Sequence, residues 1–168
     1  MAHTFDIQWL DDRWQIHDLL CRFQSAFDMQ DWAAMRACLC DEIFVDYSSF
    51  RAEAPGAQRA DDFVQRRRTA LSALHMQHNF LNLQLTRQDE SRVAGTCNYL
   101  IMRFAKDGQG ATSGFFHSYG RYVFRFCRQP DAWRIAHIEQ HLLASEGDAA
   151  LHAGARAGQA DSGASGRR

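Results

Sequence analysis

The chain has 168 residues, which is enough for one domain of ordinary size and too few for two. Its residues are 46% hydrophobic and 23% charged, so the composition is globular and excludes a wholly disordered chain. Lys and Arg number 19 against 20 Asp and Glu, and this balance argues against a basic nucleic-acid-binding surface.

Neither a membrane span nor a secretory signal is expected from the sequence. No apolar run approaches the roughly 20 residues that cross a bilayer, and the first ten residues include Asp6 but no basic segment before an apolar core. The five cysteines are an odd number without a C-x-x-C pair. They favour reduced thiols in a cytoplasmic protein over a disulfide framework or a zinc site.

The first half of the chain predicts three helices and one strand, because apolar residues recur there at three- and four-residue spacings around a short β-rich run. The expected elements are a helix over 7–29, a short helix after the N-cap Asp31, a strand over 43–47, a loop over 51–59 and a helix over 61–74. Within the last helix we place Arg66, Arg67 and Arg68 on the solvated face.

The second half of the chain predicts four antiparallel strands, because its hydrophobic period is mostly two. The expected strands are 77–87, 92–105, 115–128 and 133–143, with a glycine-containing hairpin loop over 106–113. Helices that precede strands indicate an α+β fold rather than alternating α/β, and a curved sheet packed on helices would enclose a pocket. We expect a folded domain over 1–145 and a disordered Gly/Ala/Ser/Arg tail over 146–168.

Three polar residues in apolar surroundings are candidates for chemistry. Asp28 ends the first helix, where the helix dipole disfavours a carboxylate, so it either begins a turn or has a functional partner. His78 opens a strand and is either an ordinary strand-end histidine or a base whose ring a carboxylate orients. The sharper hypothesis pairs the two in one pocket. Tyr47 is either a strand aromatic or a hydroxyl that holds a substrate carbonyl oxygen.

No metal or nucleotide cofactor is expected. His75 and His78 are three residues apart and His137 and His141 are four apart, but neither pair belongs to an H-E-x-x-H motif. The glycine-rich motifs that cradle nucleotide phosphates are absent from the sequence.

Four segments, taken in order, resemble the SnoaL-like branch of the nuclear-transport-factor-2 superfamily, and within it the scytalone dehydratases. They are FDMQDW at 27–32, VDYSSF at 45–50, MQH at 76–78 and AWRIA at 132–136, within a match over about residues 8–145. The resemblance implies a cone-shaped, cystatin-like α+β fold in which a curved antiparallel sheet wraps three helices around an internal site. It also implies cofactor-independent elimination, isomerisation or cyclisation of small hydrophobic carbonyl compounds by an Asp–His dyad.

Carried over residue by residue, the resemblance makes Asp28 and His78 the dyad, with His78 as the base. Tyr47 then matches the tyrosine that holds the substrate carbonyl through water, and Phe50 matches an aromatic that contacts the substrate. Phe27 stands where these enzymes have a second water-holding tyrosine.

Two further positions depart from the scytalone dehydratase pattern. Arg103 replaces a second catalytic histidine, and Gly120 replaces an asparagine that contacts the substrate. A permanent cation cannot shuttle protons but can stabilise an anion, so we expect a substrate other than scytalone. Arg103 faces either the pocket or solvent, and His117 on the neighbouring strand is a candidate second titrating group in the pocket.

The sequence therefore predicts a cofactor-independent dehydratase or isomerase-type lyase for a small hydrophobic carbonyl or hydroxy-carbonyl compound. The alternatives are a non-catalytic binding module, the structural small subunit of an aromatic-ring dioxygenase, and an epoxide hydrolase with an Asp-Arg-Asp site, whose flanking carboxylates we do not find. We expect no nucleic-acid or membrane partner but a homo-oligomer, dimer or trimer. Tyr122, Phe124 and Phe126 either form its outer interface or line the core.

Overall fold

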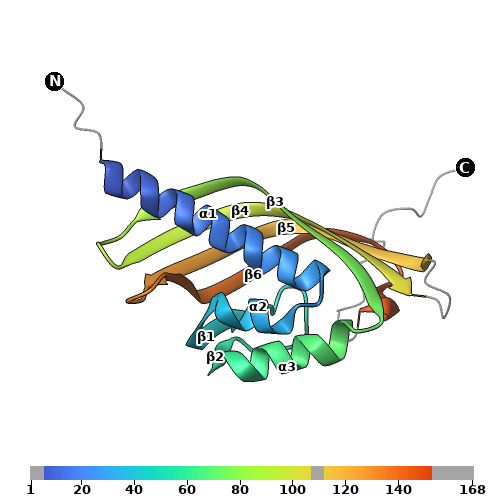
Figure 1. The fold of residues 1–168 in the computed structure, drawn as a ribbon. Helices are drawn as coiled ribbons and strands as arrows, with labels where there is room; N and C mark the ends of the chain where they lie inside the picture. Colours follow the sequence, from blue (N-terminus) through green and yellow to red (C-terminus); the bar gives the residue numbers. More distant parts are fainter. Residues whose placement is uncertain (1–5, 107–111, 153–168) are drawn as a thin grey trace, which may run out of the picture.

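The computed structural model describes residues 6–106 and 112–152, whose helices lie against one curved sheet (Figure 1). Its elements are α1 (Ile7–Asp28), α2 (Trp32–Ala37), β1 (Leu39–Asp46), β2 (Gly56–Arg59), α3 (Ala60–Leu71), β3 (Leu74–Arg87), β4 (Arg92–Lys106), β5 (Thr112–Arg128), β6 (Trp133–Gly147) and the short 3₁₀ helix η1 (Ala149–Leu151). Among these helices, none is long and apolar enough to cross a membrane.

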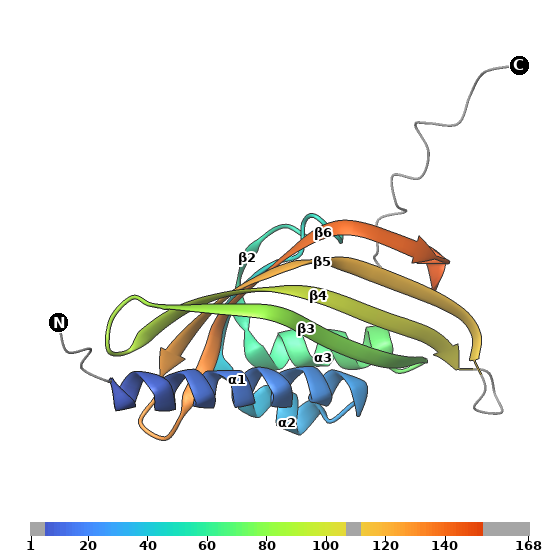
Figure 2. The ribbon, with the colours of Figure 1, turned by 90° about the horizontal axis from the view of Figure 1, so that it is seen from above.

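The described strands form one open, six-stranded sheet in the order β2-β1-β6-β5-β4-β3. All neighbouring pairs are antiparallel except β1 and β6, which run parallel. Figure 2 shows the long strands arching over α1, so that the helices cover the concave side of the sheet. The predicted α+β cone is confirmed, with the correction that its sheet contains one parallel pair.

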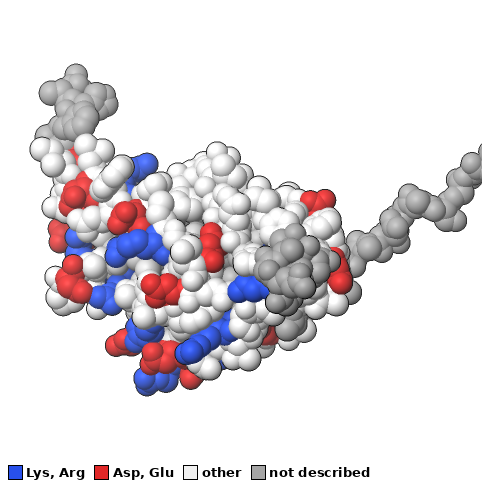
Figure 3. Space-filling model, turned by 45° about the vertical axis from the view of Figure 1, so that its right-hand side comes forward, with Lys and Arg blue, Asp and Glu red and all other residues white. Residues whose placement is uncertain are grey.

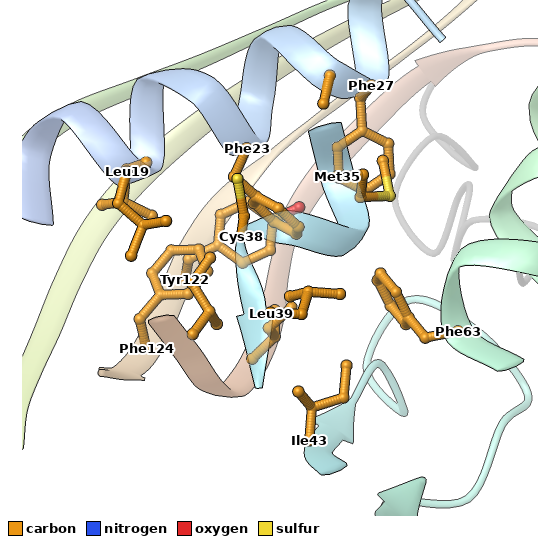
Figure 4. Packing of buried hydrophobic residues seen from close by; sticks show 14 of the residues in the cluster. Leu19, Phe23, Phe27, Met35, Cys38, Leu39, Ile43, Phe63, Tyr122 and Phe124 are labelled. Atoms are coloured by element: carbon orange, nitrogen blue, oxygen red, sulfur yellow. The ribbon is translucent and has the colours of Figure 1, made fainter. Parts of the chain in front are cut away.

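The core fills the space between α1 and the concave face of the sheet (Figure 4). Leu19, Phe23 and Phe27 of α1 are almost fully buried there, as the predicted apolar stripe requires. Tyr122, Phe124 and Phe126 of β5 are buried in the same core, at 6%, 0% and 1% exposure. Of the two predicted alternatives, an outer interface and the core, the structure places these three aromatics in the core.

Several boundaries differ from the prediction because pairing between distant segments decides them. β1 begins at Leu39, four residues before the expected strand over 43–47, because Leu39 pairs with Ile135 of β6. The predicted loop over 51–59 contains β2, since Gly56–Arg59 pairs with β1. Helix α3 ends at Leu71, three residues earlier than expected, and β3 begins at Leu74.

The predicted end of the domain at residue 145 is wrong for residues 146–152. Strand β6 continues to Gly147, η1 follows, and His152 is 2% exposed. The backbone N–H of Asp148 donates to the Phe115 carbonyl at 2.9 Å, which fastens this segment to β5. Residues 153–168 of the predicted tail, and 107–111 of the predicted hairpin loop, lie outside the described residues.

Candidate active site

A narrow cavity lies between the concave face of the sheet and the helices. Its empty space amounts to about 310 Å³ when the open solvent at its mouth is included, and only about 20 Å³ can hold the centre of a water molecule. The lining residues are Phe27, Tyr47, Phe50, Arg51, Arg67, Leu71, His78, Ile101, Arg103, Tyr122, Gln140 and His152. The space is thus sized for roughly one water, and a substrate would have to displace side chains or open the mouth.

Asp28 and His78 form a hydrogen-bonded pair at this cavity. The carboxylate Oδ1 of Asp28 lies 2.7 Å from Nδ1 of His78, and the backbone N–H of His78 donates to both carboxylate oxygens, at 2.9 and 3.0 Å. An ionised carboxylate only accepts, so Nδ1 carries the ring proton. The other ring nitrogen, Nε2, is then the basic one in the neutral imidazole.

The turn after α1 holds the pair in register. Gln30 follows α1 in the left-handed conformation, with a φ of 54°, and its side-chain amide donates to the Leu71 and Leu74 carbonyls at 3.1 and 2.9 Å. This contact ties the end of α1 to the start of β3, four residues before His78. The unfavourable place of Asp28 at a helix C-terminus is thus offset by three hydrogen bonds from one residue.

Burial determines the protonation state of His78. Its side chain is only 5% exposed, and the ring of Phe27 stacks on it with 4.6 Å between centroids. Burial lowers the pKa of His78 below its ordinary 6.5, with Arg103 adding to the effect, although the hydrogen bond to Asp28 acts the other way. The imidazole is therefore neutral near pH 7, the form that accepts a proton.

Tyr47 and Phe50 both reach the cavity from the segment after β1. Tyr47 is 5% exposed, with the guanidinium of Arg67 lying 4.8 Å from its ring centroid. Burial raises the pKa of Tyr47 above 10, so its hydroxyl is a proton-bearing donor at neutral pH. Phe50 is 1% exposed and supplies an apolar wall.

Arg103 faces the cavity and not solvent. It shares the strand parity of Tyr99 and Ile101, the inward residues of β4, and is 3% exposed. Its Nη1 donates to the Ser118 hydroxyl at 2.9 Å. Among the described residues no carboxylate lies within ion-pair distance of Arg103, so the Asp-Arg-Asp arrangement of the epoxide alternative is not formed.

Neither His117 nor Gly120 contributes to the lining of the cavity. His117 is on the opposite face of β5 and packs against the rings of Phe104 and Phe115, so the structure does not bring it to the cavity. Gly120 has no room for a side chain, because a Cβ there would lie 2.0 Å from the His141 carbonyl oxygen and 2.8 Å from the Tyr99 hydroxyl.

Three basic side chains of the lining were not predicted from the sequence. Arg67 was placed on a solvated face, but it is 2% exposed, and its spacing of four from both Phe63 and Leu71 puts it on the apolar stripe of α3. Arg51 and His152 carry no comparable signal, because Arg51 lies in an irregular segment and His152 follows a run of small and polar residues that has no hydrophobic period. In the parts of the chain that are described, no cluster of His, Cys, Asp and Glu could hold a metal ion.

A model of the SnoaL-like domain family matches residues 8–139 of the chain. No curated protein matches the sequence significantly. Solved structures agree on the fold: the Kfla4162 protein of Kribbella flavida is 20% identical, covers 84% of this chain and 96% of its own, and has a TM-score of 0.76.

Two other similar structures have names that describe elimination reactions. A candidate scytalone dehydratase of Novosphingobium aromaticivorans is 11% identical over 84% of this chain and 91% of its own, with a TM-score of 0.73. A hexachlorocyclohexane dehydrochlorinase, LinA-type3 of Novosphingobium barchaimii, is 15% identical over 88% of this chain and 97% of its own, with a TM-score of 0.69. At these identities the likeness concerns the fold.

Proposed function

The chain belongs to the SnoaL-like domain family, and from this premise we propose that it is a cofactor-independent lyase or isomerase for a small carbonyl or hydroxy-carbonyl compound. One observation carries the proposal: the Asp28 carboxylate fixes the His78 tautomer so that Nε2 is the basic nitrogen at the cavity. The names of two structural neighbours, a dehydratase and a dehydrochlorinase, describe reactions that likewise remove a proton and a leaving group.

In the proposed reaction, Nε2 of His78 takes the proton alpha to the substrate carbonyl, and the C–H electron pair becomes an enolate. Asp28 stabilises the imidazolium that results, by the hydrogen bond to Nδ1. In a dehydration the enolate re-forms the carbonyl, the beta C–O bond breaks, and the departing hydroxyl receives the proton from the imidazolium. In an isomerisation the same proton returns to another carbon, so neither outcome needs an oxidant or a reductant.

Two lining groups are suited to the enolate oxygen. Tyr47 offers a neutral hydroxyl donor, and Arg103 offers a fixed positive charge in a site with little water. A positioned general base contributes about 10²–10⁴-fold to the rate, and loss of one oxyanion donor costs about 10²–10³-fold.

The test follows proton abstraction directly, because that step is common to elimination and isomerisation. The full chain is incubated in D₂O with small β-hydroxy ketones, in neutral and carboxylate-bearing forms. Proton NMR measures deuterium exchange alpha to the carbonyl, and absorbance measures the conjugated product. We expect exchange with the native chain and at least a 10²-fold loss in His78→Ala.

Asp28→Asn keeps an oxygen acceptor for the His78 backbone, so we expect a folded variant whose exchange rate falls by at least tenfold. His75→Ala is the matched control, because His75 lies three residues earlier on the same strand and is exposed. Thermal unfolding verifies that each variant folds. Exchange at the native rate in His78→Ala would overturn the mechanism, as would an equal loss in His75→Ala.

A further inference from the structure

We propose that the substrate of this cavity is an anion, a small organic acid whose carboxylate binds among Arg103, Arg67 and Arg51. The inference rests on the proposed function for the identity of the site and adds to it a substrate class. It adds a negative charge to the small hydrophobic carbonyl compound that the sequence predicts.

The first observation is the state of Arg103. A guanidinium has five N–H donors in a planar fork, and one of them, on Nη1, bonds to Ser118. The rings of Phe50 and Phe116 flank the group, at 5.4 and 5.7 Å from its Cζ. Burial lowers the pKa of Arg103 to about 10. Such a group needs either a counter-ion or a ligand that supplies one.

Arg67 is the second buried cation. It is 2% exposed, and its Nη2 has no hydrogen-bond partner among the described residues. The nearest carboxylate is Glu53, 3.8 Å from Nη2, whose side chain is 39% exposed. The same Glu53 also lies 3.6 Å from Nη1 of Arg51, so Arg67 shares this half-exposed carboxylate with a second cation.

The charges around the cavity therefore do not balance. Arg103 and Arg67 line it, and no carboxylate is among its described lining residues. The Asp28 carboxylate lies behind His78 and is bonded to it. By contrast, basic and acidic side chains are interspersed on the exposed face in Figure 3. A bound carboxylate would supply the missing charge, and guanidinium forks match its planar geometry.

His152 adds a neutral donor to the same place. Nη2 of Arg51 lies 2.6 Å from Nε2 of His152, so Nε2 accepts and Nδ1 carries the proton. That Nδ1 is buried without a partner among the described residues. A buried N–H normally has an acceptor, and a ligand oxygen would provide one.

The rest of the lining favours an organic acid over a bare inorganic anion. Phe27, Phe50, Leu71 and Ile101 give the cavity apolar walls, which would cover a carbon skeleton. His78 lines the same cavity, so once the cavity opens to admit a small acid, the carbonyl part of that molecule would share the site with the base.

The binding test uses benzoate and its neutral isostere benzamide. Isothermal titration with the full chain in Tris at pH 7 and constant ionic strength compares their affinities, with inorganic phosphate as a third ligand. We expect benzoate to bind at least tenfold more tightly than benzamide and more tightly than phosphate. Equal affinity for benzoate and benzamide would overturn the inference, and tighter binding of phosphate would overturn the choice of a carboxylate.

Substitutions of single arginines test whether benzoate binds in the cavity. We expect Arg103→Met and Arg67→Met each to weaken benzoate at least tenfold and to change benzamide less than twofold. Arg68→Met is the matched control, because it removes the same charge from the exposed neighbour of Arg67. Arg103→Lys keeps a charge without the fork and should fall between native and Met. Native benzoate affinity in both Arg103→Met and Arg67→Met would overturn the site.

The proposed function and the anion inference can be refuted independently of each other. His78→Ala should lose exchange and still bind benzoate more tightly than benzamide. Exchange that depends on His78 with neutral ketones, without selective benzoate binding, would overturn the anion inference and leave the proposed function. Selective benzoate binding without exchange in any substrate would overturn the proposed function and leave the anion site.

Discussion

Replacing Arg103 by Met should stabilise the ligand-free protein. A guanidinium pKa of about 10, against an ordinary 12.5, means that its surroundings disfavour the charged form by about 3 kcal/mol, at about 1.4 kcal/mol per pKa unit. Loss of the hydrogen bond to Ser118 returns roughly 1–2 kcal/mol of that gain. Met keeps the apolar stem against Phe50 and Phe116. The expected net change is about 1–2 kcal/mol of added stability.

Urea unfolding followed by tryptophan fluorescence measures this change, in Tris at pH 7 without carboxylate or phosphate. Arg121→Met, at an exposed position of β5, is the matched control and should stay within about 0.5 kcal/mol of native. A loss of more than 1 kcal/mol in Arg103→Met would refute the reasoning, because it would mean that the buried cation supports the fold. Benzoate should stabilise the native chain and leave Arg103→Met unchanged.

Three other changes test the structure. Burial lowers the pKa of both His78 and His152, so below pH 6.5 the unfolded state binds more protons than the folded state. The free energy of unfolding should therefore fall below pH 6.5, by up to about 1.4 kcal/mol per pH unit for each group. Urea unfolding from pH 8 to 5 measures this fall. Gly120→Ala should cost about 3 kcal/mol, because the new methyl meets the His141 carbonyl, whereas Gly56→Ala, which meets nothing, measures the backbone effect alone. Gln30→Ala should cost about 1–2 kcal/mol in thermal unfolding and slow exchange, because it frees β3 from α1.

For each of these predictions, one result would contradict the structural reasoning. Constant stability between pH 8 and 5 would mean that the two histidines are solvated in the folded chain. Equal stability of the two glycine variants would place β5 and β6 further apart than described. Native exchange in the Gln30 variant would mean that β3 holds its register without that contact.

The Asp28–His78 pair could be predicted because each residue departs from its local preference. A carboxylate at a helix C-terminus and a histidine among strand aromatics both need a partner, and the family resemblance supplied the pairing. The inward direction of Arg103 could not be predicted, because the parity of β4 follows from its register with β3. Arg67 could have been placed from its spacing along α3, but its charge outweighed that signal.

The end of the domain could not be predicted from composition. Residues 146–152 are small and polar apart from Leu151 and His152, which is typical of a tail. They are ordered because Gly147 adopts a φ of 91° and turns the chain onto β5, where η1 packs. Such a contact depends on the curvature of the whole sheet and leaves no periodic trace in the sequence. It is also what brings His152 to the cavity.

The positive charge of the buried arginines affects both the basicity of His78 and the stability of the enolate. Positive charge in a dry cavity disfavours the imidazolium of His78, and Arg103 contributes to its lowered pKa. The same positive charge stabilises an enolate, so it lowers the basicity of His78 and also makes the substrate C–H group more acidic. A carboxylate bound beside Arg103 would offset part of the field and restore basicity to His78 when a substrate is in place. An empty cavity would then hold a weak base and an occupied one a stronger base, while the part of the field that remains would still favour the enolate.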